Sequence, residues 1–321
     1  MLYLNTDDIR TLGTDWHKVV DAVERATWLV AGGDYEQPLK PYLHLRSPRN
    51  RIIAMPAYLG GDGGAVGLKW IASFPGNCAR GKSRAHAITI LNNVQSGEPE
   101  CFINSTLLSA TRTAGVSGVM AKQFLRARHR EAFSLGIIGF GEIGVHHLAM
   151  FTQLFGDRIS RVGIYDIDER AARQRASRFS CEIDYHSSAT SLLQSTDVVV
   201  TCTTSARGYI VERPRVGALI LNVSLRDFAP AFRHFVDYMV VDSWMEVCRK
   251  ETDIELMHQQ CGLEEKDALT FVDVVTRNAI VNRPENSTVM FNPMGMAIYD
   301  IAVAALYRDK AKINGVGVNM N

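Results

Sequence analysis

Hydrophobic and polar positions change their spacing near residue 107. Before that point, a helix is predicted over 15–33, where apolar residues recur at helical spacing between a possible Asp15 N-cap and two glycines. Short alternating runs then predict strands over 51–59, 66–74, 87–91 and 100–104, with a hairpin connector at 60–64. The first part is therefore predicted to be an antiparallel sheet with a leading helix.

Helical segments and apolar runs alternate in the rest of the chain. Helices are predicted over 107–130, 146–155, 168–179 and 294–310, and strands over 133–138, 161–166, 197–203, 218–223 and 238–242. Strands that alternate with helices are typical of an α/β fold with a parallel sheet, and the last helix is placed to return to the first part. We therefore expect two domains, one formed by 1–118 with 292–321 and the other by 119–291.

A glycine-rich turn follows the first strand of the second domain. Gly139-x-Gly141-x-x-Gly144 leads from that strand into a helix, which is the context of the dinucleotide-binding fingerprint. Gly139 would permit the tight turn, Gly141 the approach of a pyrophosphate, and Gly144 the packing of the helix on the strand. The next strand ends at Asp166, 22 positions after Gly144. Its carboxylate can accept hydrogen bonds from the ribose hydroxyls and repel a 2′-phosphate, so a Rossmann domain that prefers NAD is predicted.

Composition narrows the class of protein. A length of 321 residues suits two domains, and a formal net charge of +1 gives no sign of binding to nucleic acid or to an anionic membrane. No apolar run has transmembrane length and the N-terminus lacks the features of a signal peptide, so we expect a cytoplasmic protein. Six scattered cysteines predict reduced thiols and no metal site.

Residues 76–83 match the P-loop pattern GxxxxGK[ST]. A P-loop requires a helix directly after it, whereas residues 84–91 alternate and contain β-branched side chains, which predict a strand. ATP or GTP binding is therefore not predicted. Lys82 and Arg84 are better explained as a basic loop near an anionic ligand.

Four charged residues are candidates for the chemistry. Lys69 lies in an apolar strand, so it either has a buried anionic partner or is exposed on the outer face. Arg112 is near a predicted helix start, where cations are disfavoured, and so requires an anion nearby. With Lys40, which two prolines hold, these cations could bind carboxylates. Asp227 follows a predicted strand and either faces the nicotinamide or lies in a surface turn.

Several motifs resemble those of the ornithine cyclodeaminase/μ-crystallin family along nearly the whole chain. They are Met55-Pro, Gly67-Leu-Lys69, Thr111-Arg-Thr-Ala114, the glycine-rich turn, Val200-Thr-Cys-Thr-Thr-Ser205, Asp227 and the segment from Asn292-Pro-Met-Gly to Asp300. Residues 37–43, 51–56 and 292–298 are most similar to the branch of siderophore-pathway dehydrogenases that make L-2,3-diaminopropionate. The resemblance implies a Rossmann NAD-binding domain and an α+β domain for substrate binding and dimerisation, built from the N-terminal part and the C-terminal helix.

The resemblance also implies an activity. The enzyme would oxidise N-(1-amino-1-carboxy-2-ethyl)-glutamate, here called the conjugate, at its glutamate Cα–N bond with NAD. Hydrolysis of the imine would give 2-oxoglutarate and L-2,3-diaminopropionate, a precursor of siderophores or antibiotics. The partners implied are this amino-acid substrate with several carboxylates and a second copy of the chain in a homodimer, without nucleic acid or membrane.

The family pattern assigns roles to residues of this chain. Asp227 and Lys69 would be the catalytic residues, Asp227 as the acid/base and Lys69 as the substrate lysine. Substrate contacts are implied for Lys40, Met55, Lys69, Arg84, Arg112 and Met294. Cofactor contacts are implied for Arg112, Thr113, Gly139, Gly141, Glu142, Ile143, Gly144, Asp166, Thr203, Thr204 and Ser224.

Departures from the cyclodeaminase pattern favour a substrate with several carboxylates. Lys40 stands where cyclodeaminases and crystallins have Arg, and Ile53 replaces the cyclodeaminase acid that would pair with ornithine's second ammonium. Arg84 replaces a threonine and could bind an additional carboxylate, whereas His44 stands where close relatives have Arg. The alternatives are an ornithine cyclodeaminase, a cyclic imino acid (ketimine) reductase and a non-catalytic binding protein similar to μ-crystallin.

Overall fold

The computed structural model describes residues 1–47 and 50–320. The chain divides into two compact units, one of Met1–Gly115 with Gly295–Asn321 and one of Val116–Met294. The breaks thus fall after Gly115 and Met294 rather than after residues 118 and 291. Helix α3 (Leu107–Ala127) runs across the first break.

The first unit is a mixed sheet packed against helices. Its strands are β1 (Leu2–Asn5), β2 (Tyr35–Glu36), β3 (Tyr42–His44), β4 (Arg51–Leu59), β5 (Ala65–Ser73), β6 (Ala85–Asn92), β7 (Pro99–Asn104) and β16 (Val318–Asn319). Its helices are α1 (Thr6–Leu12), α2 (Trp16–Ala31), α10 (Ala297–Asn314) and the short 3₁₀ helix η1 (Pro75–Arg80). The strand order is β16-β1-β7-β6-β5-β4-β2, and β3 also pairs with β4.

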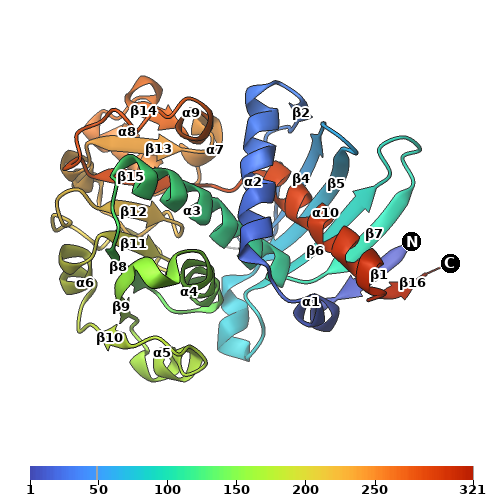
Figure 1. Cartoon of the computed structure of the whole chain (residues 1–321), viewed down its shortest axis with the longest axis horizontal. Helices are drawn as coiled ribbons and strands as arrows, with labels where there is room; N and C mark the ends of the chain where they lie inside the picture. Colours follow the sequence, from blue (N-terminus) through green and yellow to red (C-terminus); the bar gives the residue numbers. More distant parts are fainter. Residues whose placement is uncertain (48–49, 321) are drawn as a thin grey trace. The chain divides into compact units, whose positions relative to one another are not determined.

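The predicted helix and four strands of this unit are confirmed, with one correction to the sheet. Strands β4 to β7 are antiparallel, but β1 pairs parallel with β7, so the sheet is mixed. β1 was not predicted because four residues directly before a helix give too short an alternation. Helix α10 packs against α2, β4, β5 and β6, which places it across the sheet (Figure 1).

The second unit is a parallel sheet with helices. Its strands are β8 (Phe133–Ile138), β9 (Ile159–Tyr165), β10 (Ile183–Tyr185), β11 (Val198–Thr201), β12 (Leu219–Asn222), β13 (Tyr238–Val241), β14 (Ala268–Thr270) and β15 (Val289–Asn292). Its α-helices, besides most of α3, are α4 (Glu142–Phe155), α5 (Glu169–Ala176), α6 (Ala189–Ser195), α7 (Trp244–Val247), α8 (Asp253–Cys261) and α9 (Phe271–Thr276). Three 3₁₀ turns are η2 (Gly156–Arg158), η3 (Pro230–Phe235) and η4 (Glu265–Asp267).

All the strand pairs of this sheet are parallel, in the order β10-β9-β8-β11-β12-β15-β13-β14. Strand β8 lies between β9 and β11, which is the switch point of a doubly wound sheet, where ligands bind at the carboxyl ends of the strands (Figure 1). Strands β8, β11, β12 and β15 are wholly buried, as expected when both faces of a parallel sheet are covered. The predicted fold class is confirmed.

The segment that matches the P-loop pattern lies between two strands. It follows β5, forms η1 and then enters β6, so a strand follows it, as predicted, and not the helix that a P-loop needs. In the described part of the chain, no helix has both the length and the apolar character needed to cross a membrane.

Candidate functional site

The glycine-rich turn of the second unit has the geometry that its sequence predicts. Gly139 has a φ of 87°, and a Cβ there would lie 2.8 Å from the carbonyl carbon of Cys202. A Cβ on Gly144 would lie 2.5 Å from the carbonyl oxygen of Gly139, whereas one on Gly141 would meet no atom within 4 Å. Gly139 and Gly144 are therefore required by packing within the unit, and Gly141 leaves open space at the start of α4.

The start of α4 and the end of β9 offer complementary groups to a dinucleotide. Gly141 is the N-cap of α4 and provides no side-chain acceptor, so N–H groups of the first turn remain available to an anion. The Oδ2 atom of Asp166 accepts a hydrogen bond from the Phe140 N–H at 2.6 Å, and its Oδ1 accepts one from the Asp168 N–H at 2.9 Å. These bonds hold the carboxylate beside the turn, which fits a cofactor with free ribose hydroxyls.

Asp227 lies in the turn after β12 and is fully buried, which excludes the surface-turn interpretation. Its two carboxylate oxygens accept hydrogen bonds from the hydroxyls of Thr203 and Ser224, which follow β11 and β12. Burial raises the pKa of Asp227, although hydrogen bonds from Ser224, Thr203 and Thr201 oppose the increase. A carboxylate with a raised pKa is a stronger base than an ordinary aspartate, which suits it to accept a proton and return it.

The first unit contains a buried cluster of charge built around Lys69. Lys69 is 2% exposed, and its Nζ donates hydrogen bonds to Asp300 Oδ1 at 2.9 Å and to Ser109 Oγ at 2.7 Å. The Nε of Arg112 donates to the same Asp300 oxygen at 2.9 Å. Two cations therefore share one carboxylate oxygen, which leaves a surplus of positive charge that an anionic ligand would balance.

Lys40 and Gly295 lie beside this cluster. The Nζ of Lys40 donates a hydrogen bond to the carbonyl oxygen of Gly295 at 2.8 Å. Gly295 has a φ of 89°, and a Cβ there would lie only 2.6 Å from Nη1 of Arg112. Gly295 is therefore required so that Arg112 can lie against the backbone that Lys40 contacts.

The pKa values of Lys69 and Asp300 are both lowered, for different reasons. Burial lowers the pKa of Lys69 to about 8, although the Asp300 carboxylate opposes the decrease, and the charges of Arg112 and Lys40 add to it. Burial alone would raise the pKa of Asp300, but the charges of Arg112 and Lys69 hold it below its usual range. Asp300 is therefore ionised at neutral pH, while Lys69 is close to its titration range.

The other predicted site residues are distributed over both units. Met55 is buried and pairs with Lys69 across β4 and β5, and Arg84 is half-buried just before β6. The Thr113 hydroxyl donates to the Ser109 carbonyl within α3, at 2.7 Å. In the second unit, Glu142 and Ile143 open α4, Thr204 is exposed after β11, and Met294 packs against the hydrophobic core. The structure thus groups Lys69 with Met55, Arg112 and Lys40, and groups Asp227 with Thr203 and Ser224.

Two points of the sequence interpretation change. Arg112 is the sixth residue of α3, beyond its first turn, so the prediction that Arg112 lies at the helix start was wrong, although Arg112 does have an anionic partner. That partner, Asp300, was not predicted as a site residue. A carboxylate within the apolar run of α10 was the available signal, because burying it requires a cation.

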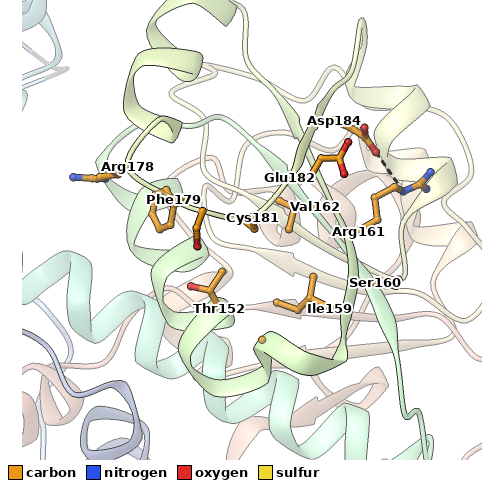
Figure 2. A pocket seen from close by; sticks show the side chains of 12 residues that line it. Thr152, Ile159, Ser160, Arg161, Val162, Arg178, Phe179, Cys181, Glu182 and Asp184 are labelled. Carbon is orange, nitrogen blue, oxygen red and sulfur yellow. Dashed lines mark ion pairs between the residues drawn. The ribbon is translucent and has the colours of Figure 1, made fainter.

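Figure 2 shows a pocket in the second unit that is separate from the glycine-rich turn. It is lined by the end of α4, the start of β9, residues 178–182 and Asp184. Gly141 and Asp166 lie at the opposite ends of α4 and β9. The Arg161–Asp184 ion pair drawn there, at 3.8 Å, joins two half-exposed side chains, and we assign no chemistry to this pocket. No group of three His, Cys, Asp or Glu side chains suited to a metal ion occurs among the described residues.

The fold and these side chains are those of an NAD-binding protein. The chain belongs to the ornithine cyclodeaminase/mu-crystallin family, whose model matches residues 8–315. It is 34% identical to the N-((2S)-2-amino-2-carboxyethyl)-L-glutamate dehydrogenase of Staphylococcus aureus over 336 residues, which cover 100% of this chain and 98% of the relative.

Two solved structures are similar over the whole chain. The Δ(1)-pyrroline-2-carboxylate reductase of Thermococcus litoralis, in complex with NADH and L-proline, has a TM-score of 0.89 at 25% identity and is covered over 100% of both chains. An archaeal alanine dehydrogenase, a dimer with bound NAD, has a TM-score of 0.82 at 25% identity, with 100% of this chain and 99% of that chain covered.

Proposed function

We propose that this protein is an NAD-dependent dehydrogenase that oxidises the conjugate at its glutamate Cα–N bond and, by hydrolysis, yields L-2,3-diaminopropionate and 2-oxoglutarate. The observation that carries the proposal is the buried surplus of positive charge at Lys69 and Arg112. The use of NAD is supported by Asp166 beside the glycine-rich turn and by the nucleotides bound in the similar structures.

Lys69 and Arg112 would bind the substrate, and Asp227 would transfer protons. Bound NAD would accept the hydride from the glutamate Cα. Lys69 and Arg112 would bind the carboxylate on that carbon and so fix the Cα–H bond in one orientation. Asp227, with its raised pKa, would take a proton from the attacking water and return one to the departing amine.

The wall around Lys69 argues against ornithine as the substrate. Ile53 lies on the same face of β4 as Met55 and pairs with Ile71 of β5. An ornithine side chain ends in a second ammonium, which requires a carboxylate or several carbonyl oxygens. These two isoleucines offer neither, so ornithine cyclodeamination is disfavoured at this position.

A substrate comparison tests the proposal. Purified protein is mixed with NAD and, separately, with the conjugate, L-alanine, L-proline or ornithine, and NADH formation is followed by absorbance. We expect kcat/KM for the conjugate to exceed the others by about 100-fold or more, because only the conjugate brings several carboxylates to the cations. A higher kcat/KM for L-proline would favour a cyclic imino acid reductase instead.

We also propose that the protein is a homodimer, which a sedimentation measurement on the same sample would test.

Replacement of Asp166 by Asn should relax the choice of cofactor. Asn keeps an acceptor for the Phe140 N–H but removes the charge that repels a 2′-phosphate. We expect kcat/KM for NADP to rise about 10-fold and that for NAD to fall by a similar factor, since one hydrogen bond to the ribose weakens. Kinetics with each cofactor at saturating substrate check this, and an unchanged ratio of the two would remove Asp166 from this role.

The pH dependence of kcat/KM should show the titration of Lys69. Its pKa of about 8 means that the side chain is protonated below pH 8 and loses its charge above it. Since a neutral amine binds a carboxylate poorly, kcat/KM should fall above about pH 8, whereas a bound carboxylate shifts the decline in kcat to higher pH. Lys69→Arg should remove the decline from both profiles because arginine stays charged. A decline that persists in Lys69→Arg would assign it to another group.

A further inference from the structure

The turn that carries Asp227 has an unfavourable backbone conformation. Leu225 has a φ of 60°, in the left-handed region that non-glycine residues rarely adopt. Such a conformation persists only where neighbouring groups hold it. One of these groups is Asn222, whose Oδ1 accepts a hydrogen bond from the Leu225 N–H at 3.1 Å.

The first residue of α8 holds the same turn from the other side. The N–H of Asp253 donates to the Leu225 carbonyl at 2.8 Å. The Oδ2 of Asp253 accepts from the N–H groups of Asp227 and Phe228, both at 3.2 Å, and from Asn222 Nδ2 at 3.0 Å. One residue thus makes hydrogen bonds to both sides of the strained position.

The carboxyl group of Asp253 lies in an environment that disfavours its charged form. It is fully buried, and its Oδ1 has no hydrogen-bond partner among the described residues. Burial raises its pKa to about 7. Lys250 and Glu251, the two residues before the N-cap of α8, have φ values of 65° and 58°, so this segment is strained as well. The N-cap of α8 is Thr252, so Asp253 is not needed to cap the helix.

We propose that Asp253 is a positioning residue, whose Oδ2 and main-chain N–H hold the Ser224–Phe228 turn so that the carboxyl group of Asp227 stays in its reactive orientation. This inference rests on the proposed catalytic role of Asp227. An acceptor oxygen at the position of Oδ2 is what holds the turn, and the negative charge of Asp253 is not required. Asn at position 253 keeps such an oxygen, Glu moves it by about one bond length, and Ala removes it.

The test compares Asp253→Asn, Asp253→Glu and Asp253→Ala with Thr252→Ala as the matched control. Thr252→Ala removes the helix cap beside Asp253 and leaves the bonds to the turn in place. Hydrogen exchange of a peptide that covers residues 222–229 reports the turn directly, and kcat with the conjugate reports the chemistry. NADH titration gives the fraction of intact cofactor sites.

Asp253→Ala and Asp253→Glu should exchange the turn amides at least about 10-fold faster. Their kcat should fall about 100-fold, because a small displacement of a catalytic group has an effect of this size. Their Kd for NADH should stay within about threefold. Asp253→Asn should keep kcat within about fivefold, and Thr252→Ala should lower only the Tm.

Two results would overturn the inference. One is unchanged exchange of the turn in Asp253→Glu, and the other is loss of kcat in Asp253→Asn with a turn as protected as in the wild type. If Asp253→Ala fails to fold, the comparison of Asn with Glu decides. If the wild type does not oxidise the conjugate, the proposed function fails, whereas the exchange measurement still shows whether Asp253 holds the turn.

Discussion

Asp227→Asn is expected to lower kcat at least about 1,000-fold while the Kd for NADH stays within about threefold. Asparagine has nearly the same shape as aspartate, its amide oxygen can accept one of the two hydrogen bonds from Thr203 and Ser224, and its NH₂ group can donate to the other hydroxyl. It cannot take up a proton, however, so water would attack and the amine would depart without a base or an acid. The effect should therefore appear in turnover rather than in cofactor binding.

A second Asp→Asn change in the same unit is the control. The carboxylate of Asp237 is exposed and accepts a hydrogen bond from the Thr288 N–H at 2.8 Å. Asp237→Asn should keep kcat within about twofold, since this residue has no part in the proposed chemistry. Turnover that survives in Asp227→Asn would remove Asp227 from its assigned role.

Lys69→Met is expected to raise KM for the conjugate about 100-fold or more, which corresponds to roughly 2.7 kcal/mol of lost binding. The cation binds the carboxylate in the ground state and in the transition state alike, so kcat should change by less than about 10-fold. Steady-state kinetics at saturating NAD measure both. A KM close to that of the wild type would contradict the assignment of Lys69 to the substrate carboxylate.

Stability should not fall in parallel with this change in binding. Removal of one partner of a buried ion pair typically costs about 3–5 kcal/mol because the other charge is left alone. Asp300 keeps Arg112 in this case, and the loss of a buried ammonium relieves the desolvation that lowers the pKa of Lys69. The Tm of Lys69→Met should therefore stay within a few degrees of the wild type. Lys18→Met, at an exposed position on α2, should change neither KM nor Tm.

The glycine-rich turn and Lys69 could be found in the sequence because each departs from a local pattern, whereas the role of Asp227 came from the family resemblance. The glycines of the turn recur at a fixed spacing between a strand and a helix, and Lys69 is a charged residue in an apolar strand. Asp300 interrupts an apolar helix in the same way and could have been found by the same argument. Long, periodic elements such as β4 and α2 were predicted for a related reason, since their spacing repeats over many residues.

Asp253 and the position of β15 could not be read from the sequence. Two of the hydrogen-bond partners of the Asp253 carboxylate are main-chain N–H groups of a turn 25 and 26 residues earlier, and main-chain groups cannot be recognised from residue types. β15 inserts between β12 and β13, although it follows β13 by almost 50 residues in the chain. Neither its three apolar residues and one asparagine nor the loops around it specify that neighbour.

Product analysis tests the central claim most directly. The protein is incubated with NAD and the conjugate, and NADH, 2-oxoglutarate and L-2,3-diaminopropionate are quantified together by absorbance and mass spectrometry. The proposed reaction predicts equal amounts of all three, and at least about 1,000-fold slower steady-state formation of them in Asp227→Asn. Absence of NADH with the conjugate, together with release of proline and ammonia from ornithine, would contradict it.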